Sequence, residues 1–105
     1  MESTTEATRR VTCQIRRSVG RYVRGETSLA FLASSLDQVI LFAEVNGVAC
    51  AHALRDAWYE IEDINALALA SAETSSIEVQ SSSAIHRVLD KLIVIVSDVE
   101  SVRTQ

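Results

Sequence analysis

Apolar residues recur every three or four positions along most of the chain, a spacing that predicts α-helices rather than strands. The first such stretch begins at Ser3-Thr4-Thr5-Glu6, which has the spacing of a capping box, and ends at Gly25, a residue type that often follows helices. One stripe of this helix is expected to be buried, with arginines on the other side. The stripe contains Val11, Ile15, Ser18, Val19 and Tyr22.

Two further amphipathic stretches predict a second and a third helix. The second begins at Thr27 or Ser28, both good N-cap residues, and ends near Asn46-Gly47. The third extends roughly from Val48 to Ala70, and we expect Trp58 at the centre of the core. The expected buried positions are Leu29, Leu32, Leu36, Val39, Ile40 and Ala43 on the second helix, widened by Phe31 and Phe42, and Leu54, Trp58, Ile61 and Asn65 on the third. Asn65 is the polar member of this set, and we expect its amide to hydrogen-bond across the bundle.

Residues 71–76 are small and polar, and they predict the longest loop. A last helix follows, with a further capping-box pattern at Ser75-Ser76-Ile77-Glu78. Its expected stripe comprises Ile85, Val88, Leu89, Leu92, Ile95, Val96 and Val99. We expect Ser81-Ser82-Ser83 to break or delay this helix, and the β-branched segment Leu92 to Val96 leaves a buried strand as the alternative.

Four amphipathic helices with short connections pack most simply as an antiparallel four-helix bundle, so the fold class expected is all-α. The chain has 105 residues, of which 48% are apolar, enough for one core and therefore a single domain over residues 1–105. It contains three glycines and no proline, too few for the many tight turns of a β-sandwich.

The two cysteines, Cys13 and Cys50, are far apart in the sequence and predict neither a disulfide framework nor a zinc site. We interpret them as free thiols, as in a reducing cytoplasm. The first ten residues lack the basic start and apolar run of a secretion signal, and the longest apolar stretch is five residues. A cytoplasmic protein without membrane contact is the expectation.

No residue pattern predicts catalysis. His52 and His86 lie on different predicted helices without the spacing of a zinc site, and no glycine-rich loop could cradle a phosphate. A carboxylate pair such as Glu60 and Asp63 would need a cleft to act as acid and base. We therefore expect a protein that is not an enzyme and that needs no cofactor or metal.

Charge is distributed unevenly along the chain. Residues 1–24 contain six Arg and two Glu, a net charge of +4, whereas residues 25–105 contain four basic and twelve acidic residues, a net charge of −8. The arginines could simply cover acidic neighbours or face water. Alternatively, an acidic surface could bind a basic protein partner and accelerate that encounter. The candidate partner-binding residues are Asp56, Glu60, Glu62 and Asp63, followed by Asp37 and Glu44, although Glu62 could instead pair with an arginine of the first helix.

Two segments of the chain carry a family resemblance, Tyr22-Val23-Arg24-Gly25-Glu26-Thr27-Ser28 and Leu54-Arg55-Asp56-Ala57-Trp58-Tyr59-Glu60-Ile61-Glu62-Asp63-Ile64-Asn65-Ala66. They resemble the small helical bacterial immunity proteins related to colicin D immunity and to the antidotes of contact-dependent growth inhibition toxins. The resemblance implies a cytoplasmic helical bundle that binds one cognate toxin domain, often a basic tRNA-cleaving nuclease, and blocks its active site. Its acidic surface would fill the positive cleft of the nuclease as a phosphate mimic.

Two other classes of function are alternatives. The first is a homo-oligomeric adaptor or regulator whose dimer seam uses Phe31, Phe42, Ile93 and Val94. The second is a nucleic-acid-associated regulator that uses the arginines between Arg9 and Arg24, which the acidic remainder of the chain argues against.

Overall fold

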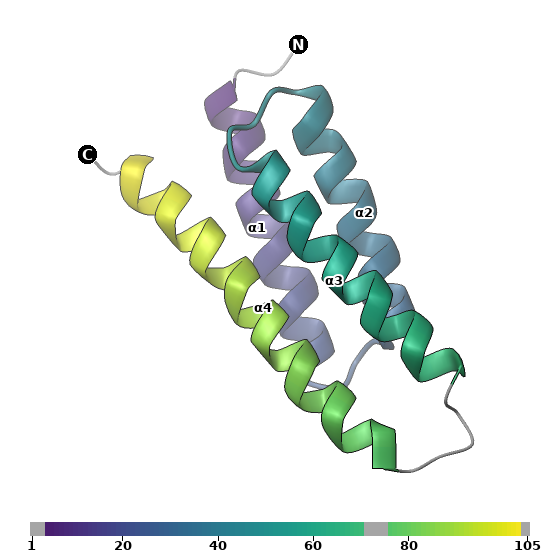
Figure 1. Ribbon diagram of the computed structural model, residues 1–105. Coiled ribbons are helices and arrows are strands. Elements are labelled where there is room, and N and C mark those ends of the chain that lie inside the picture. The colour runs from purple at the N-terminus through teal and green to yellow at the C-terminus, as the bar shows by residue number, and fades with distance from the viewer. Residues whose placement is uncertain (1–3, 71–75, 104–105) are drawn as a thin grey trace.

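The computed structural model describes residues 4–70 and 76–103, and this part of the chain forms four α-helices. They are α1 (Thr4–Val23), α2 (Leu29–Val45), α3 (Ala51–Ala70) and α4 (Ser76–Arg103). Consecutive helices run antiparallel, and α4 also packs on α1, so that the four helices close into a bundle (Figure 1). Each helix has two neighbours, and α1 lies diagonally opposite α3. The all-α, four-helix expectation is confirmed.

The core lies along the axis of the bundle, and each helix contributes its apolar stripe to it. Its largest fully buried side chains are Val11, Ile15, Leu32, Leu36, Ile40, Leu54, Ile61, Leu92 and Val96. At about 25 cal/mol per Å² of apolar surface removed from water, this burial is the main force that holds the helices together. The molecule measures 47 × 23 × 22 Å, and its long dimension follows the helices (Figure 1).

Local residue chemistry fixes the ends of α1 and α2. Gly25 follows α1 with a φ of 79°, and Gly47 follows α2 with a φ of 68°, a left-handed conformation that glycine adopts without strain. In both turns the next amide bonds back across the turn, from Glu26 to the Arg21 carbonyl (2.9 Å) and from Val48 to the Ala43 carbonyl (2.9 Å). These are Schellman motifs, and they satisfy carbonyls that the helix itself leaves free.

Ser28 is the N-cap of α2, since its Oγ accepts a hydrogen bond from the Phe31 amide (3.1 Å). Of the two cap residues predicted, the structure uses Ser28. The caps expected at Ser3 and Ser75 lie outside the described residues.

Two expectations about the helices are wrong, and one alternative is excluded. α3 begins at Ala51 rather than near Val48, because the Val48 amide closes the Schellman turn of α2. α4 runs without a break through Ser81-Ser82-Ser83, and Leu92 to Val96 is helical, so the strand alternative fails. The helical period of the apolar residues along α4 outweighs the local preferences of serine and β-branched residues, since packing against α1 and α3 buries that stripe.

Two expectations about the core also need correction. Trp58 is only partly buried and lies where α3 meets α2, because its indole N–H needs an acceptor that the apolar centre cannot offer. Asn65 is partly exposed, and its side-chain amide makes no hydrogen bond to the part of the chain that the structure describes. Asn65 lies at the edge of the apolar stripe, where water can form hydrogen bonds with its amide.

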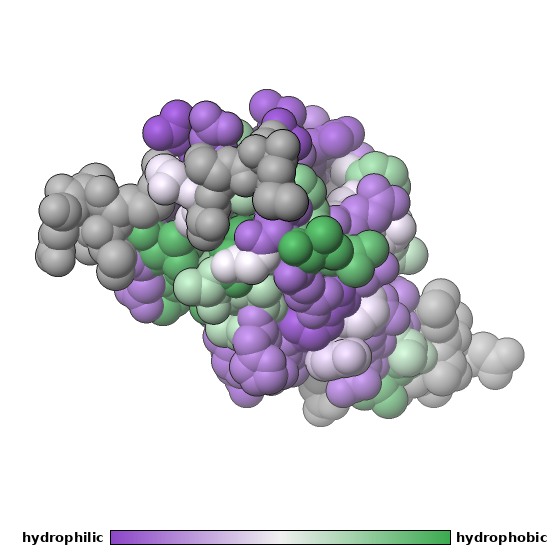
Figure 2. Space-filling model, turned by 90° about the horizontal axis from the view of Figure 1, so that it is seen from above, coloured by the Kyte–Doolittle hydropathy of each residue, from purple (hydrophilic) through white to green (hydrophobic). Residues whose placement is uncertain are grey.

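The surface is largely hydrophilic. Figure 2, which views the bundle from above, shows apolar residues in separate patches between polar ones. The large apolar side chains that stay exposed are Val23, Phe31, Leu41, Val45, Tyr59, Leu67 and Val94. Within the described ranges, none of the helices combines the length and apolar character that crossing a bilayer requires.

Candidate protein-binding surface

The structure separates the six predicted partner-binding residues into two groups, according to whether another side chain already holds them. Asp37, Glu44 and Glu60 are engaged in ion pairs between helices. Asp56, Glu62 and Asp63 form no ion pair with a lysine or arginine among residues 4–70 and 76–103. The predicted acidic cluster is therefore smaller than the sequence suggests.

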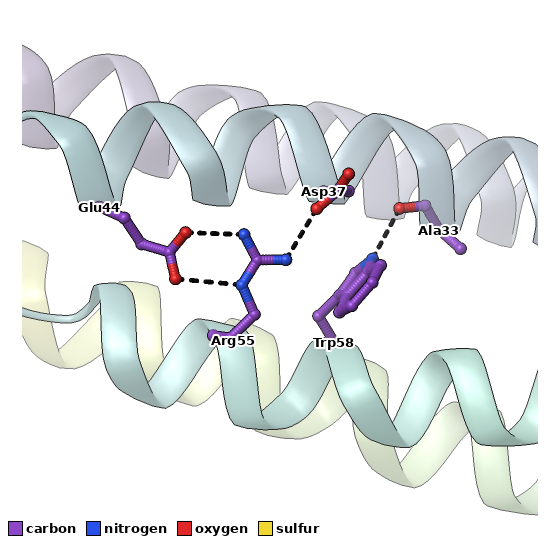
Figure 3. A network of polar contacts seen from close by, with 5 residues as sticks. All are labelled: Ala33, Asp37, Glu44, Arg55 and Trp58. Atoms are coloured by element: carbon purple, nitrogen blue, oxygen red, sulfur yellow. Dashed lines mark hydrogen bonds and ion pairs between the residues drawn. The ribbon is translucent and has the colours of Figure 1, made fainter.

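Arg55 of α3 binds both acidic residues of α2 (Figure 3). Its Nε and Nη2 donate to the two oxygens of Glu44 at 3.1 and 2.7 Å, and its Nη1 donates to Asp37 Oδ1 at 2.7 Å. The guanidinium carbon also lies 4.9 Å from the centre of the Trp58 ring. These contacts leave the Arg55 side chain 14% exposed, so it serves as a structural link between α2 and α3.

The link changes the titration of its partners. The hydrogen bond from Arg55 lowers the pKa of Glu44 below its ordinary value, against a smaller opposing effect of desolvation. The same bond raises the pKa of Arg55 further above its usual range. Arg55 occupies both carboxylate oxygens of Glu44, which makes Glu44 a poor candidate for binding a basic partner.

Glu60 belongs to the contact between α3 and α4. Its two carboxylate oxygens accept hydrogen bonds from Lys91 Nζ at 2.9 and 3.0 Å. Together with Asp63 and Arg87, this pair borders an open hollow of about 270 Å³ between the two helices. The mixed charge of that hollow favours no single sign of ligand.

Two of these three carboxylates, those of Asp56 and Asp63, lie on what we call the α3 outer face, formed by His52, Asp56, Tyr59, Asp63 and Leu67. These positions are three or four residues apart and therefore share one side of the helix. Asp56 approaches only His52 Nε2, at 3.6 Å, and both side chains are largely exposed to water. Tyr59 is 57% exposed and lies between the two aspartates in sequence, with its ring centre 5.4 Å from that of Trp58.

Sequence reasoning missed Tyr59, although the spacing Asp56, Tyr59, Asp63 already places the three side chains on one side of a helix. The alternative pairing of Glu62 with an arginine of the first helix is wrong. Glu62 is partly buried on α3, whereas α1 lies diagonally across the bundle and does not pack against it.

The arginines of α1 differ in their contacts. Arg16 donates to Glu100 (2.8 Å) and Ser97 (3.0 Å) of α4, and Arg24 pairs with Glu26. In contrast, the guanidinium groups of Arg9, Arg17 and Arg21 have no partner in the described part of the chain. The arginine-rich helix therefore covers acidic neighbours only in part.

Residues 4–70 and 76–103 contain no cluster of three or more residues suited to hold a metal ion. The chain matches no known protein family, and comparisons with curated proteins and with solved structures also gave no match. The assignment of function therefore depends on the geometry of the surface.

Proposed function

We propose that this protein is a binding protein, not an enzyme, and that it captures a positively charged protein through the α3 outer face. The observation that carries the proposal is the placement of exposed Tyr59 between Asp56 and Asp63, two carboxylates that form no ion pair with a lysine or arginine in the described residues. Tyrosine is enriched among the residues that contribute most to protein interfaces, and rim charges steer the partner toward the correct orientation.

The resemblance to small helical bacterial immunity proteins gives this partner a class. It would be the nuclease domain of a cognate toxin, most naturally an RNase or tRNase, whose substrate-binding cleft must be positively charged to hold RNA. Asp56 and Asp63 would occupy positions that RNA phosphates otherwise take, and Tyr59 would provide the apolar anchor. Inhibition would then take place in the cytoplasm of the producing cell by binding alone.

The test uses the purified chain and the protein encoded by the neighbouring gene, first assayed for nuclease activity. Asp56→Lys combined with Asp63→Lys should weaken binding at least about thirtyfold, and Tyr59→Ala by a similar factor, as measured by calorimetry. The matched control is Asp90→Lys with Asp98→Lys, which changes two exposed acidic residues of α4 and alters the net charge equally. Circular dichroism verifies that each variant is folded.

The proposal fails if both double variants weaken binding equally, because general charge would then explain the effect. It also fails if neither double variant nor Tyr59→Ala changes the affinity. If the neighbouring gene product does not bind the unaltered chain, the immunity assignment is wrong. Binding of another basic protein with the same dependence on Asp56 and Asp63 would still support the α3 outer face as the docking surface.

A homodimer is a second candidate, favoured by the side of α2 that faces water. Phe31, Leu41 and Val45 are 53%, 54% and 76% exposed there. The dimer seam proposed from sequence is divided, since Val94 and Ile93 lie on α4, the helix diagonally opposite α2. Light scattering of the unaltered chain and of Leu41→Lys tests the α2 surface: a dimer that the variant converts to a monomer would favour this candidate.

A further inference from the structure

A small hollow lies between α1 and the start of α2, away from the α3 outer face. Its volume is about 100 Å³, and we call it the Thr27 pocket. The side chains that matter for its chemistry are those of Arg17, Ser18, Arg21, Thr27 and Ser35, with Phe31 at the border. No acidic residue lines it.

Both arginines of the pocket are uncommitted. Arg17 and Arg21 lie one helical turn apart on α1, and neither contacts a carboxylate in the part of the chain described here. Two guanidinium groups on one side of a helix repel each other and favour an anion between them. In contrast, Arg16 and Arg24 on the same helix are each paired.

Thr27 also lines the pocket. Its Oγ1 is the one buried side-chain oxygen or nitrogen within the described ranges that has no hydrogen-bond partner. A buried hydroxyl without a partner destabilises the fold, and an acceptor bound in the pocket would give it that partner. The positive end of the α2 dipole, beginning at the Ser28 cap, lies beside this hydroxyl and also favours negative charge.

We propose that the Thr27 pocket binds a phosphate group. Two guanidinium groups and three hydroxyls supply more donors than a carboxylate can accept, whereas a phosphate monoester presents three acceptor oxygens and nearly two negative charges. The neighbouring Phe31, 53% exposed, gives a flat apolar surface for whatever carries the phosphate. This site is independent of the proposed toxin-binding face, since it lies on α1 and α2.

The first test is titration of the full chain with inorganic phosphate at constant ionic strength, followed by NMR. Saturable shifts at Arg17, Arg21 and Thr27 are expected. Arg17→Gln and Arg21→Gln should each weaken binding about tenfold. Arg9→Gln is the matched control, because Arg9 is also an exposed, unpaired arginine of α1 but does not border the pocket. It should change the affinity less than twofold.

Thr27→Val distinguishes a hydroxyl that contacts bound phosphate from a hydroxyl that only stabilises the fold. In phosphate-free buffer, this variant should melt at the same or a higher temperature than the unaltered chain, because it removes a buried oxygen without a partner. In phosphate, its rise in melting temperature should be smaller than that of the unaltered chain. A variant that melts lower without phosphate and gains the same increment from it contradicts the proposal.

A final comparison identifies the source of the phosphate. A short peptide with one phosphoserine is titrated beside its unphosphorylated form and beside inorganic phosphate. Tighter binding of the phosphopeptide indicates a phosphorylated partner chain, and equal affinity for peptide and inorganic phosphate indicates that the phosphate group is the whole ligand. Non-saturable shifts, or equal losses in Arg9→Gln and Arg17→Gln, would overturn the site, because they show unspecific attraction of anions.

Discussion

The guanidinium group of Arg55 on α3 holds the carboxylate of Glu44 on α2 through two hydrogen bonds, of 3.1 and 2.7 Å, across eleven residues of sequence. The third hydrogen bond of Arg55 goes to Asp37, which lies nearly two turns before Glu44 on α2. One side chain thereby fixes how far the two helices can slide along each other. It also pairs two of the six carboxylates that the sequence predicts for binding a partner.

Removal of Arg55 should destabilise the fold. Arg55→Ala leaves Asp37 and Glu44 without their cation and uncovers part of Trp58, so we expect a loss of about 2 kcal/mol in the free energy of unfolding, discounted for the exposure of both carboxylates. Urea denaturation measures this loss. Arg55→Lys should recover less than half of it, because an ammonium cannot form the paired contact with Glu44. Full recovery in the lysine variant would show that charge alone, rather than geometry, stabilises the link.

The same pair predicts a dependence of stability on pH. The folded chain lowers the pKa of Glu44 from its ordinary value of 4.5 through the bond from Arg55. The carboxylate form therefore adds stability above that value, and this contribution is lost as the pH falls below it through the folded-state pKa. Urea titrations from about pH 7 to about pH 3 should show the free energy of unfolding of the unaltered chain approaching that of the Glu44→Gln variant as the pH falls. A constant gap between the two over this range would contradict the assignment.

Trp58 makes a hydrogen bond that can be removed separately from its packing. The indole N–H donates to the carbonyl of Ala33 at 2.8 Å (Figure 3). Trp58→Phe should cost about 1–2 kcal/mol for the lost bond and the smaller ring, and Trp58→Ala about 3 kcal/mol or more. Chemical denaturation followed by circular dichroism measures both, since these variants lack the only tryptophan. Equal losses in the two variants would show that the hydrogen bond, not ring burial, dominates.

Two glycines of α1 and its cap should respond oppositely to the same substitution. Gly25→Ala forces a side chain into the left-handed region at a φ of 79° and should destabilise the protein by about 1 kcal/mol. Gly20→Ala should stabilise it by roughly 0.5 kcal/mol, because Gly20 is inside the helix and a new Cβ would meet only the flexible end of Arg24, 3.1 Å away. Thermal melts of the two variants check this, and a stabilising Gly25→Ala would contradict the Schellman geometry.

The two thiols should differ in reactivity. Cys13 is exposed, whereas Cys50 is buried, and desolvation raises the pKa of Cys50. Less thiolate and less access both slow its alkylation. Mass spectrometry after brief exposure to iodoacetamide should show one added group on the folded chain, at Cys13, and two after unfolding in urea. Early modification of Cys50 in the folded chain would indicate that the turn before α3 opens.

The sequence alone determined the four helices, most of their buried positions and the turns at Gly25 and Gly47, because the spacing of residues within a helix and the chemistry of a turn are local properties. It narrowed the cap of α2 to Thr27 or Ser28. Only the tertiary structure decided which charged residues stay free. The antiparallel packing of α2, α3 and α4 places Arg55 opposite Glu44 and Lys91 opposite Glu60. Whether a carboxylate is paired depends on the neighbouring helix that faces it, and no spacing within one helix contains that information.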